Sequence, residues 1–159
     1  FNFFMENIII NYWAVGVCAI LSMVLGGIWY GPLFGKKWME IIGVSTLDPE
    51  ANKRMQKTYL PLYIVQFVLT LFQVLILLHF VIRTVYLSDV LARCILIWAA
   101  FIIPTVAGGA MWNNDSSKVA WSRFLIQAGY QLILFMVFGL ILWKWGWSGY
   151  NPLHDIRPF

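Results

Sequence analysis

Four long apolar stretches separate the polar parts of this chain, and they limit its fold more than any other feature. They cover about residues 8–30, 59–82, 90–112 and 124–145. A helix needs roughly 20 apolar residues to cross the hydrocarbon of a bilayer, and each stretch reaches that length. Backbone groups in lipid must be paired within their own segment, so the spans are predicted to be helical. We therefore expect one all-α integral membrane domain over residues 1–159, with four transmembrane helices.

The composition excludes the main alternatives. Hydrophobic residues make up 61% of the 159 residues and charged residues 11%, which leaves too few charges to cover a water-soluble domain. Runs such as LTLFQVLILLHFVI lack the alternation of membrane β-strands. No Lys or Arg precedes the first stretch, so it is expected to be a retained span and not a cleaved signal peptide.

The segment GGIWYGPLFGKKWMEIIG, residues 26–43, invites comparison with a phosphate-binding loop. A Walker A loop has four residues between its glycines and a Ser or Thr after its Lys. Here three residues separate Gly31 from Gly35, and Lys37 follows Lys36. The phosphate-binding interpretation therefore fails, and the segment is predicted to be the turn where the first span reaches the membrane surface.

This interfacial turn is expected to combine aromatic, glycine, proline and basic residues, namely Trp29, Tyr30, Gly31, Pro32, Gly35, Lys36, Lys37 and Trp38. Gly31 is expected to adopt a left-handed conformation where the span ends, with Pro32 in the first turn of a new helix. Apolar residues then recur at helical spacing opposite the lysines. About residues 33–43 are therefore predicted to form a short amphipathic helix on the bilayer surface.

Aromatic and basic residues predict how the spans meet the two membrane surfaces. The aromatic residues at the span ends are interpreted as interfacial anchors: Trp29, Tyr30, Tyr59, Tyr63, Trp112, Trp121, Trp143, Trp145 and Trp147. The first and third connections carry Lys36, Lys37, Lys53, Arg54, Lys57, Lys118 and Arg123, against Arg83, Arg93, Lys144 and Arg157 on the other side. The positive-inside bias places these two loops in the cytoplasm and both termini outside. A membrane surface also explains the net charge of +4, so no nucleic-acid partner is expected.

Three motifs carry a resemblance to a known family. The runs LGGIWYGPLFGKKWM, IIPTVAGGAMW and IQAGYQL are similar to those of a small prokaryotic membrane family catalogued as domain of unknown function 1761. Its members carry a WYGPLFGKxW signature after the first of four predicted spans and an AGYHL-type element in the last. The resemblance implies a four-span fold in a prokaryotic plasma or inner membrane and implies no activity. Where many relatives have His in the last motif, this chain has Gln131, so a metal-binding or proton-passing role does not carry over to this position.

Small residues recur in the first and third spans and predict close helix packing. The residues of this packing groove are Ala14, Cys18, Ser22, Gly26, Gly27, Gly108 and Gly109. Spans one and three are therefore expected to pack centrally. The groove is expected to meet either a helix of the same chain or a helix of a second copy. LGGIWY and AGGAMW also suggest a parallel internal repeat of these two spans.

Polar side chains within the spans form the second candidate site. They are Asn11, Gln66, Thr70, Gln73, Gln127, Tyr130 and Gln131. An unpaired amide in hydrocarbon costs several kcal/mol, so the four glutamines are expected to face the interior. Two alternatives remain open: the amides bond to one another across helices, or they line a polar cavity for a small ligand.

The charged residues and the two histidines form no pattern typical of ion coupling, catalysis or metal binding. No Asp or Glu lies within any predicted span, which argues against an ion-coupled transporter or a proton pump. His79 and His154 lack companions at metal-ligand spacing. We expect no catalytic residue, no metal site and no cofactor.

Three functions follow, in order of preference. The leading hypothesis is a non-enzymatic structural or accessory membrane component that self-associates or docks on another membrane protein. The alternative is a carrier or channel for a small neutral or lipid-like molecule. A membrane-embedded enzyme is the third, and it requires that distant loops converge.

Overall fold

The computed structural model describes residues 9–43, 49–82, 84–113 and 115–148. In chain order its elements are β1 (Ile9–Ile10), α1 (Tyr12–Ile28), η2 (Trp29–Leu33), α2 (Gly35–Ile41), α3 (Pro49–Val81), α4 (Leu87–Ile97), η3 (Trp98–Ile102), α5 (Ile103–Met111), α6 (Ser117–Trp145) and β2 (Trp147–Ser148). The two η elements are π-helical turns, so α1 with η2, and α4 with η3 and α5, each form one continuous span.

Four spans in the described ranges are long and apolar enough to cross a membrane: Tyr12–Leu33, Tyr59–Val81, Leu87–Met111 and Ser117–Trp145. The predicted all-α class with four such helices is confirmed. Residue 8, the predicted start of the first span, lies outside the described residues. The fourth span was expected from residue 124, yet α6 begins at Ser117, because Ser116 has the extended backbone of an N-cap residue. Lys118 and Arg123 therefore belong to the first turns of α6 and not to a loop.

Helix α6 is the centre of the bundle. It packs against α1, α3, α4 and α5, and its large side chains Leu134, Phe135, Phe138 and Leu142 are buried. The expectation that spans one and three form the central pair is wrong. The small side chains of span one are buried where α1 packs on α3 and α6 instead.

The core is concentrated in the half of the bundle where α3, α4 and α6 meet. Val74, Leu77 and Leu78 of α3 pack there with Phe138 of α6 and Cys94 of α4. A Cβ added at Gly139 of α6 would lie 2.8 Å from the Sγ atom of Cys94. A glycine at position 139 therefore sets the close approach of α4 and α6.

Proline residues accompany both π-helical turns. Pro32 lies inside η2 and Pro104 follows η3 by two residues, and each lacks the N–H that a regular helix needs at its position. In η2 a backbone hydrogen bond spans five residues where an α-helix spans four: Phe34 N donates to Trp29 O at 2.9 Å. In the third span, the irregularity near Pro104 likewise takes the form of a wider turn, η3.

Two details of the expected interfacial turn are corrected. Gly31 does not adopt the left-handed conformation, which among the described residues belongs to Gly43 with a φ of 70°. Pro32 does not start a new helix, because it continues the first span as part of η2. The next helix, α2, begins at Gly35, where a Cβ would lie 2.8 Å from the carbonyl oxygen of Tyr30.

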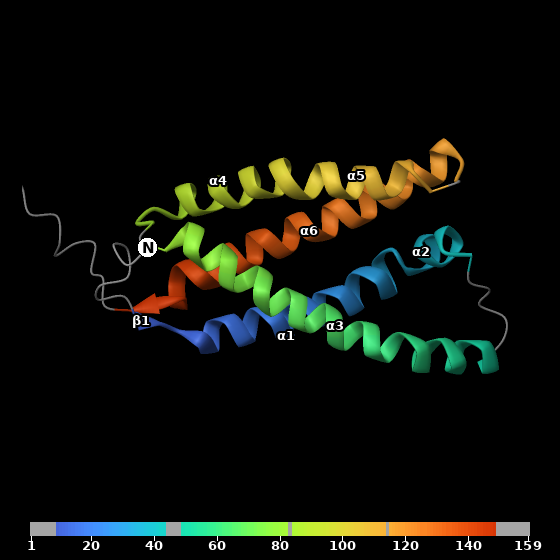
Figure 1. The fold of residues 1–159 in the computed structure, drawn as a ribbon, viewed down its shortest axis with the longest axis horizontal. Helices are drawn as coiled ribbons and strands as arrows, with labels where there is room; N and C mark the ends of the chain where they lie inside the picture. The colour runs from blue at the N-terminus through green and yellow to red at the C-terminus, as the bar shows by residue number, and fades with distance from the viewer. Residues whose placement is uncertain (1–8, 44–48, 83, 114, 149–159) are drawn as a thin grey trace, which may run out of the picture.

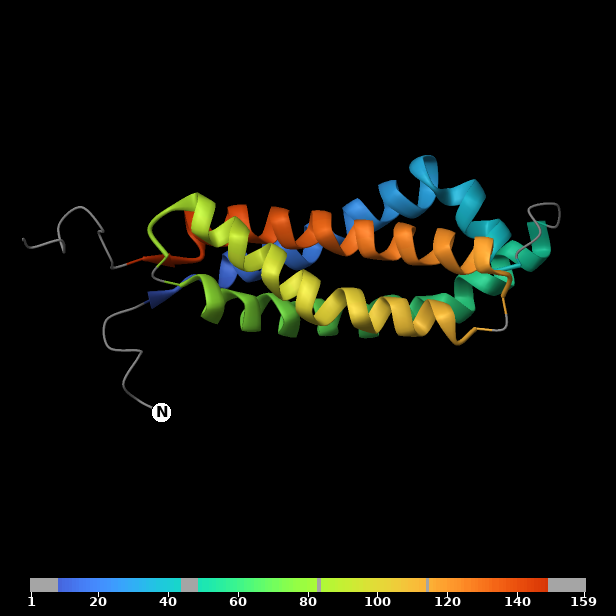
Figure 2. The same ribbon diagram turned by 90° about the horizontal axis from the view of Figure 1, so that it is seen from above.

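The two ends of the bundle differ in structure (Figures 1 and 2). At one end β1 and β2 pair antiparallel, with Ile9 opposite Ser148 and Ile10 opposite Trp147. At the other end lie α2 and the connection from α5 to α6. Figure 1 shows that α3 crosses the bundle obliquely, so its early part lies at one edge, away from α4 and α5. This oblique course decides which polar residues of α3 face the interior.

Candidate functional site

Two tryptophans attach the first and third spans to the same segment of α6. The indole Nε1–H of Trp29 donates to the carbonyl oxygen of Ile126 at 3.0 Å. The indole Nε1–H of Trp98 donates to the carbonyl oxygen of Ala128 at 2.9 Å. Each tryptophan is the first residue of a π-helical turn. The irregular parts of two spans therefore meet one short stretch of the central helix.

Glycines permit the close contact between these spans and α6. A Cβ at Gly129 would lie 3.3 Å from the ring of Trp29, and a Cβ at Gly26 would lie 3.0 Å from the hydroxyl of Tyr130. That hydroxyl donates to the carbonyl oxygen of Ser22 at 2.8 Å. The IWY part of the first motif and the AGYQ part of the last motif are thus one contact surface, which neither motif reveals alone.

An aromatic cluster extends this contact to α2. The ring centroids of Tyr30 and Tyr130 are 5.3 Å apart, and those of Tyr30 and Trp38 are 4.9 Å apart. Trp29 packs on Phe34 at 4.7 Å. Trp29 and Tyr30 belong to η2, Phe34 and Trp38 to the start of α2, and Tyr130 to α6, so η2 and α2 are folded onto the central helix.

Two of the predicted anchors also make contacts within the protein. Trp29 and Trp143 are both half-buried and bond to other elements, and their headgroup depth stays a prediction. Trp143 donates its indole N–H to the carbonyl oxygen of Val85 at 3.1 Å. Trp112, by contrast, is 91% exposed. The side chain of Trp147 lies outside the described part of the chain.

The expected internal repeat paired Trp29 with Trp112. In the structure the counterpart of Trp29 is Trp98, because both begin a π-helical turn and both donate to a carbonyl of α6. Sequence reasoning missed Trp98 because it paired the glycine doublets that precede Trp29 and Trp112. One signal was present: Trp98 stands in the middle of a span, where an interfacial anchor is out of place.

The small-residue groove lies within this chain over most of its length. Ala14, Cys18 and Ser22 are buried, and α1 packs on α3 and α6. A Cβ at Gly27, Gly108 or Gly109 would meet no atom within 4 Å. The first part of the groove is therefore filled by helices of the same chain, and the remaining glycines have no close neighbour in the described structure.

The polar residues are not brought together as one network. Asn11 caps α1, where its side-chain oxygen accepts from Trp13 N at 3.1 Å. Gln66 is exposed, which contradicts the expectation that it faces the interior, because the early part of α3 lies at one edge of the bundle. Thr70 is buried and bonds within α3. Within the described ranges no hydrogen bond joins two of the four glutamines.

Gln127 and Gln131 lie one helical turn apart on α6, and Gln73 lies on α3. All three are half-buried. The Oε1 atom of Gln131 is buried without a hydrogen-bond partner among the described residues. Of the candidate cavity residues, Gln127, Tyr130 and Gln131 are therefore the ones that share a segment with the two tryptophan contacts.

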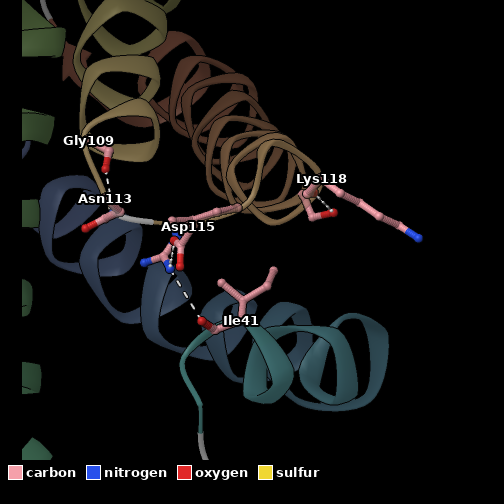
Figure 3. Close-up of polar contacts among 7 residues, drawn as sticks. Ile41, Gly109, Asn113, Asp115 and Lys118 are labelled. Carbon is pink, nitrogen blue, oxygen red and sulfur yellow. Dashed lines mark hydrogen bonds and ion pairs between the residues drawn. The ribbon is translucent and has the colours of Figure 1, made fainter.

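An ion pair fastens the end of the bundle that contains α2 (Figure 3). The Nη2 atom of Arg123 bonds to the carboxylate of Asp115 and lies 3.4 Å from the carbonyl oxygen of Ile41 at the C-terminal end of α2. Asn113 donates to the carbonyl oxygen of Gly109 at 2.7 Å. A cation is favourable beside the last carbonyls of a helix. The cluster links α2 to the start of α6, and spacing in the sequence did not predict it.

The described residues offer little for metal or thiol chemistry. In these parts of the chain no group of three His, Cys, Asp or Glu side chains is placed to hold a metal ion. Cys18 and Cys94 are free and buried on different helices. What the arrangement does provide is a rigid contact between aromatic N–H donors and backbone carbonyls in a low-dielectric setting.

The four apolar spans, three of them packed around the central span α6, define a multi-pass helical membrane protein. The chain belongs to the family described as protein of unknown function (DUF1761), whose model matches residues 13–143. The resemblance drawn from the motifs is thereby confirmed. No match was found among curated proteins or among solved structures.

Replacement of Trp29 or Trp98 by Phe tests the two indole contacts. Each change removes one N–H donor and is expected to lower the free energy of unfolding by about 0.5–1.5 kcal/mol. The measurement is denaturant unfolding in mixed detergent micelles, followed by Trp fluorescence and circular dichroism.

Trp112→Phe is the matched control, because it deletes the same atoms from an exposed side chain. If Trp29→Phe and Trp98→Phe each lose no more stability than Trp112→Phe, the two hydrogen bonds do not hold the spans on α6.

Proposed function

We propose that this protein is a non-enzymatic structural or accessory component of a membrane, which associates laterally with a membrane protein. One observation supports the proposal most: the early part of span two lies outside the bundle and carries the polar side chain of Gln66. Within Tyr59–Leu69, Phe67 is half-buried and the other side chains are exposed.

Lipid is a poor partner for the Gln66 side chain in this part of α3. Gln66 lies seven residues after Tyr59, the start of the span, which at 1.5 Å per residue is about 10 Å into it. An unpaired amide at that depth is unfavourable. Its Nε2 atom lies 3.4 Å from Thr70 Oγ1 in the same helix, which is a long contact. A protein neighbour that supplies a polar group at this depth would satisfy Gln66.

The proposal moves the association surface away from the small-residue groove. Ala14, Cys18 and Ser22 are already covered by the chain's own helices. The exposed part of α3 has the two properties that helix association in lipid uses, namely accessible surface and a polar side chain.

Site-specific photocrosslinking in native membranes tests this proposal. A benzophenone amino acid replaces Leu69, or Leu96 of α4 as the matched control; both leucines are exposed. We expect a protein adduct from position 69 and lipid adducts from position 96, because only the former neighbours Gln66. Lipid adducts alone at both positions would contradict lateral association through α3.

A second candidate function is a carrier for a small neutral or lipid-like molecule, and the buried Oε1 atom of Gln131 favours it. Interruptions at corresponding places in two spans point to binding sites in transporters, and η2 and η3 both lie against the segment that precedes Gln131. Asn11 and Gln66 lie apart from this segment, so the candidate path reduces to Gln73, Gln127, Tyr130 and Gln131.

Solute flux into proteoliposomes tests the second candidate. For a carrier, uptake of a neutral solute such as glycerol exceeds that of protein-free vesicles, and Gln131→Leu reduces it severalfold because the acceptor is lost. Thr105→Val is the control, since Thr105 is exposed and bonds to a carbonyl of its own helix. Uptake that Gln131→Leu leaves unchanged would exclude a path along Gln131.

A further inference from the structure

We propose that the surface formed by Leu62, Gln66 and Leu69 on α3, here called the Gln66 face, binds a second copy of this chain. The pair is two-fold symmetric, and the carboxamides of the two Gln66 residues hydrogen-bond to each other across the axis. This inference rests on the proposed function and names the partner.

The Gln66 face is a contiguous surface outside the bundle. Leu62 and Leu69 stand four residues before and three residues after Gln66, so the three side chains lie on one side of the helix. Leu62 is 57% exposed and Leu69 is 56% exposed. Thr70, next to Leu69, is 1% exposed, so the face begins where α3 turns away from its own bundle.

Thr70 leaves the Gln66 carboxamide ready for an external partner. The Thr70 hydroxyl donates to the Gln66 carbonyl oxygen at 2.8 Å, and its oxygen is the acceptor 3.4 Å from Gln66 Nε2. One N–H of the amide is thus directed along its own helix. The second N–H and the Oε1 atom have no partner among the hydrogen bonds of the described residues and project from an exposed side chain.

A second copy fits this pattern better than lipid or an unrelated protein. A carboxamide carries both a donor and an acceptor, so two of them satisfy each other without any further residue. Copies inserted in the same direction present Gln66 at the same depth, which a two-fold axis along the membrane normal requires. Acyl chains offer neither group, and a different protein needs its own polar side chain at the matching depth.

Energy transfer between donor-labelled and acceptor-labelled copies in lipid vesicles, measured over a series of protein-to-lipid ratios, tests the pair. Gln66→Leu is expected to weaken association about 3- to 10-fold, because one interhelical amide contact in lipid is worth that much. Gln66→Asn, which keeps the carboxamide, is expected to retain part of the association. Thr105→Val is the matched control and leaves it unchanged, because Thr105 is an exposed polar residue on a different helix.

Disulfide trapping tests the geometry independently of affinity. Leu69→Cys is expected to form a covalent dimer under mild oxidation, because Leu69 lies on the Gln66 face. Val68→Cys is the control, since Val68 is equally exposed at 56% but lies about 100° around the helix from Leu69 and outside the Gln66 face. The native Cys18 and Cys94 are buried, so the unmodified chain is expected to remain uncrosslinked.

Three results would overturn the inference. Association that Gln66→Leu does not weaken, or trapping that is as efficient from position 68 as from position 69, would exclude the Gln66 face. Absence of energy transfer in vesicles would exclude a second copy as the partner. The proposed function would survive that last result if photocrosslinking at position 69 in native membranes still yields an adduct with a different protein.

Discussion

The structure depends on backbone carbonyls of α6 that accept a second hydrogen bond from another span. A carbonyl has two lone pairs, and the regular helix uses only one of them. Trp29 and Trp98 donate to Ile126 and Ala128, and the ring of Trp29 lies against Gly129. In a medium without water, such donors have no competing partner. Two spans are thereby fixed at one level of the central helix.

This constraint explains the family motifs in physical terms. The tryptophan of the first motif needs a backbone without a Cβ opposite its ring, which Gly129 of the last motif supplies. The tyrosine of the last motif needs the same from Gly26, and its hydroxyl donates to the backbone carbonyl of Ser22 within α1. Pro32 widens the turn that aims the aromatic residues. The motifs are complementary halves of one interface, although about a hundred residues separate them.

Hydropathy was sufficient to predict the four spans, because a membrane helix satisfies its backbone alone and shows itself as an apolar run. Contacts between spans were not predictable in the same way, since side chains that face lipid and side chains in the core are equally apolar. Gln66 and Thr70 share a stripe in the sequence, yet only Thr70 is buried, because α3 crosses the bundle obliquely. The pairing of Arg123 with Asp115 and Ile41 depends on tertiary folding and left no local signal.

Four membrane-crossing helices, three of them packed around α6, are the basis for both the proposed partner surface and the tryptophan contacts. Spin labels introduced one at a time at Ile20, Val65, Leu96, Leu140 and Phe138, in lipid bilayers, test this arrangement by relaxation with oxygen and with a water-soluble nickel chelate. The first four side chains are exposed and Phe138 is buried. We expect high oxygen and low nickel accessibility at the four exposed positions, and low values for both reagents at position 138. High nickel accessibility at any exposed position would show that its helix does not cross the bilayer.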